Sequence, residues 1–242
     1  SGTLNLHITV HDTNDNNPQF TNSTYYTTVP ENLAPGRTIA RVHARDRDSG
    51  LYGQVLYSFS PRTDSTYGHL FGIKNTTGEI FVKGEIDYER NHVYHLVVTA
   101  HDRGPDSLPA DATLIVNVRD INDNAPEITV NTLTATGTDS AELAEDAESG
   151  TFVAHITVKD PDSGRNGQFD CSLSNEHFQL QKLYSNEYKI ATRGAFDREA
   201  RSEYTISVTC QDDGAEPQVS IKRLRVIITD FNDNAPVFTK PR

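Results

Sequence analysis

The sequence predicts an all-β protein made of two seven-stranded β-sandwiches in tandem. Short runs of β-branched and aromatic residues alternate with turn residues, and no amphipathic helical period is visible in the 242 residues. An Asp- and Asn-rich heptad occurs three times, starting at Asp12, Asp120 and Asp230, so that the copies lie 108 and 110 residues apart. Because one β-sandwich domain has about 100 residues, the heptads mark domain boundaries.

These boundaries predict two complete domains with a fragment at each end. Residues 18–126 and 127–236 are the complete sandwiches. Residues 1–17 are expected to be the last strand and linker of a preceding repeat, and residues 237–242 the start of a following repeat or a tail. In this interpretation the chain is a piece of a longer protein built from such repeats.

Seven short strands are expected in each domain, in a similar order. The first domain has candidate strands at 25–29, 38–44, 54–59, 70–73, 79–82, 93–100 and 112–118. The second has them at 128–133, 151–158, 168–173, 178–180, 188–192, 204–210 and 221–228, with a loop or bulged strand at 134–139. Alternation is clearest at 95–100, where Leu96, Val98 and Ala100 are expected to face the core. We expect the strands to pair in antiparallel fashion.

The two cysteines, Cys171 and Cys210, fall on inward-facing positions of the third and sixth strands of the second domain. These strands are neighbours in a sandwich sheet, so the two side chains are expected close together. Two buried thiols are favoured over a cross-strand disulfide, because directly opposite residues in a ladder sit slightly too far apart for the bond. The disulfide remains the alternative.

The heptad at 120–126 has the composition of a cation site. Asp120, Asn122, Asp123 and Asn124 are four oxygen-bearing side chains within five residues, and Pro126 cannot continue a sheet ladder. Such a segment has no apolar reason to become ordered. Calcium would order it, because Ca²⁺ binds six to eight oxygens from carboxylates, amide side chains and backbone carbonyls.

Acidic residues outside the heptads keep the same spacing in both domains. The pairs are Glu31/Asp46 and Glu145/Asp160 at 15 residues, Asp87/Asp102 and Asp197/Asp212 at 15 residues, and Asp102/Asp120 and Asp212/Asp230 at 18 residues. Single Asp and Asn residues in loops are usually turn formers, but a set in register is not explained in this way. The spacing therefore predicts one site that occurs again in each repeat.

Strand parity predicts where these side chains lie. Loops after the first, third and fifth strands lie at the end where the chain leaves the sandwich, which places Glu31, Asp87 and Glu89 beside the heptad 120–124. Loops after the second and sixth strands lie at the opposite end, which turns Asp160, Asp162 and Asp212 of the second domain toward the same heptad. With Asp120 and Asp123 this junction would hold eight carboxylates. Three divalent cations would reduce that charge from −8 to −2, and without them the like charges would repel.

These motifs resemble the calcium motifs of cadherin repeats over the whole chain. The matching residues are Glu31 in Pro-Glu-Asn, Asp87 to Glu89 in Asp-x-Glu, Asp120 to Asn124 in Asp-x-Asn-Asp-Asn, Asp46 to Asp48 and Asp160 to Asp162 in Asp-x-Asp, and the single aspartates Asp102 and Asp212. Residues 124–128, 169–173 and 196–203 look most like a protocadherin, and the large Fat and Dachsous cadherins are also similar. The resemblance implies Ig-like Greek-key sandwiches of the cadherin type.

Carried over residue by residue, the resemblance implies three calcium ions at the central junction. The first would take Glu31, Asp87, Glu89 and Asp123. The second would share Glu31, Glu89, Asp120, Asp123 and Asp162, with the carbonyl of Ile121. The third would take Asn122, Asp160, Asp162 and Asp212, with the carbonyls of Asn124 and Asn166.

Two outer sites are expected to be incomplete in this chain. At the first, Asn14, Asn16, Asp46, Asp48 and Asp102 would hold one ion, and Tyr52 stands where the second domain has Asn166. At the last, the ligands would be Glu145, Asp197, Glu199, Asp230 and Asp233. Each lacks a neighbouring repeat, so partial occupancy is expected.

Composition restricts the compartment and the partners. The net charge of −12 argues against nucleic acid and anionic membrane as partners. A membrane-spanning helix needs about 20 apolar residues, and no apolar run in the sequence approaches this length. Membrane attachment is therefore expected only through a segment outside this chain. The sequons at Asn22 and Asn75 are candidate N-glycosylation sites and, like calcium, they indicate the extracellular part of a plasma-membrane protein.

The resemblance implies an adhesion module rather than an enzyme. Paired carboxylates also serve glycosidases, but every acidic pair here is already assigned to a junction. Calcium would stiffen the rod of repeats, and the partner would be another cadherin ectodomain, in an antiparallel contact with the same protein on an apposed cell. The alternatives are a structural spacer and a heterophilic Fat- or Dachsous-like segment.

Overall fold

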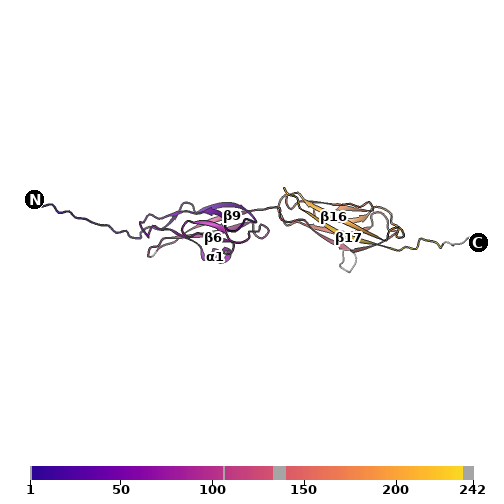
Figure 1. Ribbon diagram of the computed structural model, residues 1–242, viewed down its shortest axis with the longest axis horizontal. Helices are drawn as coiled ribbons and strands as arrows, with labels where there is room; N and C mark the ends of the chain where they lie inside the picture. The colour runs from indigo at the N-terminus through magenta and orange to yellow at the C-terminus, as the bar shows by residue number, and fades with distance from the viewer. Residues whose placement is uncertain (1, 106, 133–139, 237–242) are drawn as a thin grey trace, which may run out of the picture. The chain divides into compact units, whose positions relative to one another are not determined.

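The computed structural model describes residues 2–105, 107–132 and 140–236, which fall into two compact units, Ser1–Ile121 and Asn122–Arg242. Unit 1 contains β6, β9 and α1, and unit 2 contains β16 and β17, as labelled in Figure 1. Each unit has its own buried apolar cluster. Within the described residues, no helix has the length and apolar character that a membrane span requires.

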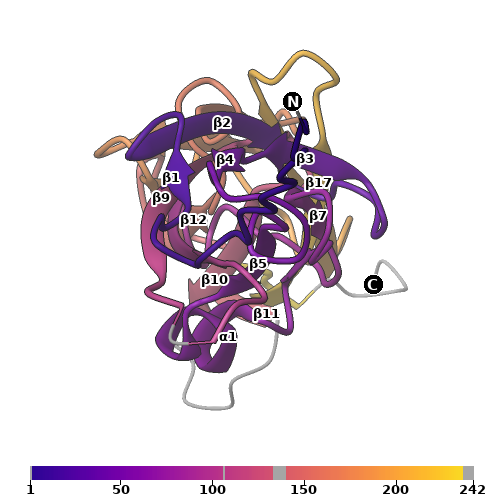
Figure 2. The ribbon, with the colours of Figure 1, turned by 90° about the vertical axis from the view of Figure 1, so that its left-hand side faces the viewer.

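Unit 1 is a sandwich of two sheets and a short two-stranded pair. One sheet contains, in spatial order, β2 (Thr24–Pro30), β9 (Ala110–Arg119), β8 (Val93–His101) and β5 (Leu56–Phe59). The other contains β3 (Thr38–Arg41), β7 (Glu79–Val82) and β6 (Phe71–Ile73), while β1 (Gln19–Phe20) pairs with β4 (Ala44–Arg45). Figure 2, viewed from the side of the N-terminus, labels β1 to β4.

Unit 2 has two four-stranded sheets. The first contains β10 (Glu127–Thr132), β12 (Phe152–Lys159), β15 (Glu187–Thr192) and β14 (Phe178–Lys182). The second contains β11 (Ser140–Ala144), β17 (Val219–Thr229), β16 (Glu203–Asp212) and β13 (Phe169–Leu173). The expected end of the first strand at residue 133 and the expected loop at 134–139 lie outside the described residues, as do residues 237–242.

The core follows the alternation that the sequence predicts. Along β8, exposed or half-buried residues alternate with buried Tyr94, Leu96, Val98 and Ala100, so the prediction that the last three face the core is confirmed. β16 repeats this pattern in unit 2. The all-β sandwich fold predicted from the sequence is therefore confirmed.

One expectation about the backbone is wrong, and one short element is additional to those expected. β2 pairs with β9, and β11 with β17, in parallel rather than antiparallel register. The reason is strand parity: the first and seventh strands run in the same direction, so they are parallel when they are adjacent. A short helix, α1 (Pro61–Tyr67), also interrupts the expected all-strand pattern. It starts with Pro61 after Ser60, whose hydroxyl oxygen accepts a hydrogen bond from the Thr63 N–H, and it is too short to show a helical period.

The cysteines form a disulfide, so the preference for two free thiols is wrong. Cys171 and Cys210 are directly opposite in the antiparallel pair of β13 and β16, with an S–S distance of 2.03 Å. Their Cα atoms are 4.1 Å apart. Antiparallel ladders alternate between wide pairs and narrow pairs, and this is a narrow one, so the assumed gap does not exist here.

Candidate metal centre

Each sandwich has an outgoing end, where the last strand leaves it, and an incoming end, where the chain enters it. At the outgoing end of unit 1, Glu31 follows β2 and is 1% exposed. Its Oε1 accepts a hydrogen bond from the Ile121 N–H at 2.7 Å, and its Oε2 accepts one from the Tyr88 N–H at 2.8 Å. Oxygens of Glu31, Glu89 and Asp120 lie within 4.8 Å of one another. Three chain segments thus bring three carboxylates to one point.

Unit 2 repeats this arrangement at its own outgoing end. Glu145 is 7% exposed, and its Oε1 accepts from the Phe231 N–H at 2.6 Å while its Oε2 accepts from the Arg198 N–H at 2.9 Å. Oxygens of Glu145, Asp197 and Glu199 lie within 4.8 Å of one another. Each carboxylate oxygen that accepts one N–H keeps a second lone pair, so the buried glutamate can still bind a cation.

At the incoming end of unit 1, amide and carboxylate side chains form a network of two hydrogen-bonded groups. Asn14 Nδ2 donates to Asp102 Oδ1 at 3.4 Å and to the Pro105 carbonyl at 3.1 Å. Asn16 donates to both oxygens of Asp48, at 3.1 Å from its backbone N–H and 2.5 Å from its side chain. The Asp48 N–H donates to Asp46 Oδ1 at 2.9 Å. The five residues named for the first outer site are therefore all held by hydrogen bonds at this end.

The incoming end of unit 2 has the same network. Asn122 Nδ2 donates to Asp212 Oδ1 at 3.0 Å and to the Glu216 carbonyl at 2.8 Å. Asn124 donates to both oxygens of Asp162, at 3.2 Å from its backbone and 2.6 Å from its side chain. The Asp162 N–H donates in turn to Asp160 Oδ1 at 3.1 Å. The expected ligands of this end thus hold one another in place.

Buried oxygen atoms at these ends favour a cation. Asn14 Oδ1, Asp46 Oδ2 and Asn122 Oδ1 are buried and accept no hydrogen bond. In Asn14 and Asn122 the Nδ2 atom donates to two acceptors. These bonds fix the orientation of the amide, so that its Oδ1 atom faces the side where no donor lies. A buried acceptor without a donor costs about 1–3 kcal/mol. A hard cation would satisfy these atoms, so the residues present fit calcium.

Four glycines shape the incoming ends, and sequence reasoning missed them. A Cβ on Gly104 would lie 2.3 Å from Asn14 Nδ2, and one on Gly214 would lie 2.4 Å from Asn122 Nδ2. A Cβ on Gly53 would lie 2.0 Å from the carbonyl oxygen of Asp48, and one on Gly167 would lie 2.1 Å from that of Asp162. The repeated Asp-x-Gly at Asp102 and Asp212 was the signal that could have found the first pair.

Some expected ligands stand apart from the tight acidic groups. Asp87 pairs with Arg90 at 3.0 Å and also accepts the Arg90 N–H at 2.9 Å. Asp230 pairs with Arg198 at 2.9 Å. Among the other expected ligands, Asp233 accepts from the side chain of Asn234 at 2.6 Å, and Asn166 is half-buried in the loop before β13. The arginines compete with a cation for these carboxylates.

One ligand candidate has a shifted pKa. Burial raises the pKa of Asp48, but hydrogen bonds from the side chain and backbone of Asn16, and then from Asp15, outweigh it and lower the pKa below the ordinary value of 3.8. Asp48 is thus held in its charged form, which is the form that binds a metal ion.

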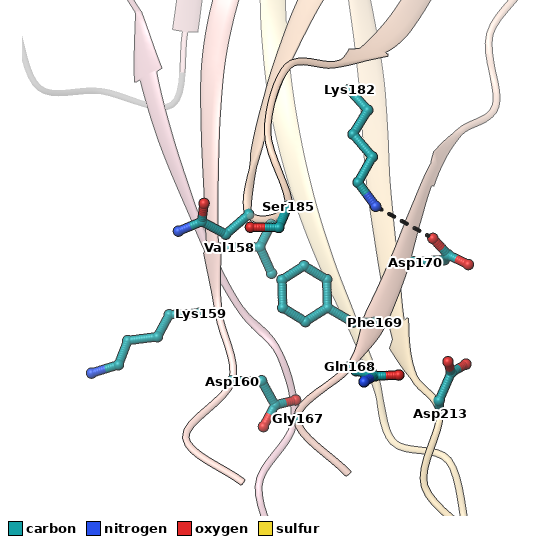
Figure 3. A pocket seen from close by; sticks show the side chains of 11 residues that line it. Val158, Lys159, Asp160, Gly167, Gln168, Phe169, Asp170, Lys182, Ser185 and Asp213 are labelled. Carbon is teal, nitrogen blue, oxygen red and sulfur yellow. Dashed lines mark ion pairs between the residues drawn. The ribbon is translucent and has the colours of Figure 1, made fainter. Parts of the chain in front are cut away.

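A hollow of about 550 Å³ lies beside Asp160 in unit 2. Figure 3 shows the ring of Phe169 among its lining residues, with Lys182 directed toward Asp170 at 3.9 Å. None of the described lining residues is a histidine or cysteine. The lining presents an aromatic ring and an exposed ion pair rather than a nucleophile beside a base.

The two sequons lie on the surface of unit 1. Asn22 is exposed in the segment between β1 and β2, and Asn75 is exposed in the turn between β6 and β7. Both asparagine side chains are therefore open to modification.

Comparisons with known proteins agree with this geometry. A family model described as "Cadherin domain" matches residues 25–119 and 139–229. Human Protocadherin-10 is 40% identical over 242 residues, which cover 100% of this chain and 23% of that relative, so the chain spans less than a quarter of its length. A structure of protocadherin gamma B2 extracellular cadherin domains 1–5 has a TM-score of 0.84 and 35% identity, over 95% of this chain and 42% of that one. A protocadherin gammaB7 EC3–6 cis-dimer structure has a TM-score of 0.76 and 35% identity, over 92% and 49%.

Proposed function

Because the chain belongs to the cadherin family, we propose that it is a calcium-binding segment of a cell–cell adhesion ectodomain. The observation that carries the proposal is the repetition of one polar arrangement at equivalent places in two sandwiches. Buried Glu31 and Glu145 each bind two backbone N–H groups from two other segments, and each lies in a tight group of three acids. A turn former would need no such burial.

The proposed calcium ligands are those that the sequence assigns. In unit 1 they are Asn14, Asn16, Asp46, Asp48 and Asp102 at the incoming end, and Glu31, Asp87, Glu89, Asp120 and Ile121 at the outgoing end. In unit 2 they are Asn122, Asp123, Asn124, Asp160, Asp162, Asn166 and Asp212 at the incoming end, and Glu145, Asp197, Glu199, Asp230 and Asp233 at the outgoing end. Bound calcium neutralises these carboxylates and cross-links the segments that carry them.

The heptad gives calcium a mechanical role. Its first two residues, Asp120 and Ile121, belong to unit 1, and Asn122 is the first residue of unit 2. Since no spacer separates these residues in the sequence, ions that order the heptad stiffen the connection between successive repeats. We propose the boundaries 18–126 and 127–236 for the repeats. The exposed, alternating Leu4, Leu6, Ile8 and Val10 support the assignment of residues 1–17 to a preceding repeat, whose core would bury them.

The proposed partner is another cadherin ectodomain, the same protein on an apposed cell in an antiparallel contact. The related protocadherin gammaB7 has been solved as a cis-dimer, which supports cadherin–cadherin association as the class of interaction. The proposed place is the extracellular part of a plasma-membrane protein, with N-glycans at Asn22 and Asn75. No catalytic role is assigned, because the acidic groups are taken as metal ligands.

Chelation tests the calcium part of the proposal. Thermal unfolding and small-angle scattering of the purified chain should both change when calcium is removed, with a lower melting temperature and a wider spread of shapes. The same melting temperature and the same scattering curve in calcium and in chelator would contradict the proposal.

Sedimentation tests the adhesive part. The chain is measured alone and joined to additional repeats of the same protein, in calcium. Self-association in the longer form supports homophilic adhesion. Monomers in both forms favour the alternatives, a structural spacer or a segment with a different cadherin as its partner.

A further inference from the structure

A row of basic side chains runs along one side of unit 1. Arg41, His43, Arg45 and Arg47 are all exposed, while the residues between them, Val42, Ala44 and Asp46, are buried. This strict alternation, which begins in β3 and passes through β4, places the four basic side chains on the outer side. At about 3.3 Å per residue the row is about 20 Å long. We call these four residues the basic stripe.

The positive charge of the basic stripe is only partly offset by its surroundings: Glu79 lies opposite Arg41 in the pairing of β3 with β7, and the charge of Arg41 acts on it. Within the described residues, Arg45 and Arg47 form no ion pair, and Arg41 Nε donates to the Thr77 carbonyl at 3.0 Å rather than to an acid. Asp46 points inward, where its Oδ1 accepts from the backbone of Asp48. The stripe is therefore a local positive surface on a chain whose net charge is −12.

Two hollows flank the basic stripe and share Arg45. One, of about 450 Å³, is lined by Arg45 and Arg47 with Asn16, Asn17, Gln19 and Phe20. The other, of about 310 Å³, includes Arg41, His43 and Arg45 with the turn residues Thr76 and Thr77, and the buried Asp46 also contributes to its lining. Each hollow thus places two arginines and several hydrogen-bonding groups around one recess. Guanidinium groups bind oxyanions through paired hydrogen bonds, so each recess suits one anionic group.

We propose that the basic stripe binds a linear sulfated polysaccharide. Successive recesses along a row match a chain that carries anionic groups at intervals. Nucleic acid fits less well, because residues 41–47 contain no Phe, Tyr or Trp, and stacking on bases would fall to His43 and to the half-buried Phe20 that lines one hollow. A membrane surface fits less well, because none of the exposed large apolar side chains lies in the stripe. The four residues of the basic stripe are not proposed calcium ligands, but Asn16 and Asp46 of the ligand set line the two hollows, so the test keeps calcium constant.

The test compares two double variants of the whole chain. In Arg45→Gln plus Arg47→Gln the stripe loses two charges, while Arg165→Gln plus Arg193→Gln removes two exposed arginines from unit 2. All four side chains are exposed, so both variants are expected to fold, which circular dichroism checks. Binding to size-defined heparin and to chemically desulfated heparin is measured by titration at several salt concentrations, with calcium constant.

We expect the parent and the unit 2 variant to bind heparin with equal affinity. Both should bind desulfated heparin much more weakly. The stripe variant should bind at least about tenfold more weakly, and the slope of log Kd against log salt should fall by about two, one for each lost contact. Equal loss in both variants, or no loss in the stripe variant, overturns the proposal. The proposal is also overturned if DNA or anionic vesicles bind through the stripe as tightly as heparin does. Self-association that depends on the stripe and occurs without heparin overturns it as well, because each result assigns the surface to another partner.

Discussion

Glu31 accepts a hydrogen bond from the backbone N–H of Ile121 at 2.7 Å, across 90 residues of sequence. The same carboxylate accepts the N–H of Tyr88, so it holds together the loop after β2, the loop after β7 and the chain that leaves β9. Glu145 does the same for Phe231 and Arg198. In each sandwich, a buried glutamate therefore holds together segments that carry proposed metal ligands.

Replacing Glu31 with glutamine should separate this structural role from metal binding. The amide keeps one acceptor oxygen but loses a charge and points a donor at a backbone N–H. We expect calcium affinity to fall at least about tenfold, as for other changes around metal sites. In chelator the effect on the melting temperature should be small, because the lost hydrogen bond is partly offset by weaker repulsion from Glu89 and Asp120.

The measurement is calorimetric calcium titration together with thermal unfolding in calcium and in chelator. The matched control is Glu127→Gln, which changes an exposed glutamate on β10. Equal calcium affinity in Glu31→Gln and in the control would mean that Glu31 has only a structural role.

Gly214→Ala should disturb the incoming end of unit 2 without removing any ligand. The new Cβ would lie 2.4 Å from Asn122 Nδ2 and 2.5 Å from its Cγ, so the side chain of Asn122 must move away from Asp212. We expect a loss of about 1–3 kcal/mol in stability, as for overpacking, together with weaker calcium binding. Gly104→Ala should act in the same way on Asn14 in unit 1.

Urea unfolding and calcium titration of both glycine variants give the two readouts. The neighbouring exposed change Ala215→Ser serves as the control for unit 2. A Gly214→Ala variant that keeps the calcium affinity of the control would show that the position of Asn122 does not matter for the ion.

The sequence predicted the sandwich and the grouping of the acids because both depend on long-range regularities. Alternation places Leu96 and Val98 in the core, and this does not depend on the structure of the loops. Strand parity places Glu31 and the Asp-x-Glu segment at one end without any knowledge of contacts. The spacing of Glu31 and Asp102 from the other acids, which Glu145 and Asp212 repeat, then predicts the same site in both domains.

What the sequence did not predict depends on short-range contacts. α1 has seven residues and its helical character comes from the cap at Ser60 and from Pro61, which a search for periodicity does not detect. The pairing of Asp87 with Arg90 depends on side-chain conformation. Whether two opposite cysteines can bond depends on which kind of ladder pair they occupy, and one residue of register decides that.

The disulfide should contribute substantially to the stability of unit 2. It closes a loop with a sequence separation of 39 residues, for which chain-entropy estimates give about 3–4 kcal/mol. Cys171→Ala plus Cys210→Ala removes both thiols, so no lone buried thiol confuses the result. We expect the free energy of unfolding of unit 2, measured in urea, to fall by about 2–4 kcal/mol, and that of unit 1 to stay the same.

Mass spectrometry under denaturing conditions checks the bond itself. The parent should gain the mass of two hydrogen atoms on reduction, and the double variant should gain nothing. No mass change in the parent on reduction, with both thiols reacting freely with an alkylating agent beforehand, would restore the free-thiol interpretation.

The pair formed by Glu203 and Arg225 should make the stability of unit 2 depend on pH in a defined direction. Arg225 donates two hydrogen bonds to the Glu203 carboxylate, at 2.6 and 2.7 Å. These hydrogen bonds are the largest effect and lower the pKa of Glu203 below its ordinary value of 4.5; burial raises it by less, and the charge of Arg225 lowers it further. Because the folded pKa is the lower one, the contribution is present above the unfolded pKa and is lost as pH falls through the folded pKa.

Glu203→Gln removes this contribution, so the difference in unfolding free energy between parent and variant should be constant from about pH 7 to about pH 5. Below 4.5 the difference should shrink as the carboxyl is protonated. Urea unfolding in calcium-free buffer at a series of pH values measures this difference in unfolding free energy. The control is Glu142→Gln, which changes an exposed glutamate on β11. Both side chains are largely exposed, so added salt should reduce the difference at neutral pH. A difference that grows as the solution is acidified would mean that the pair does not lower the pKa of Glu203.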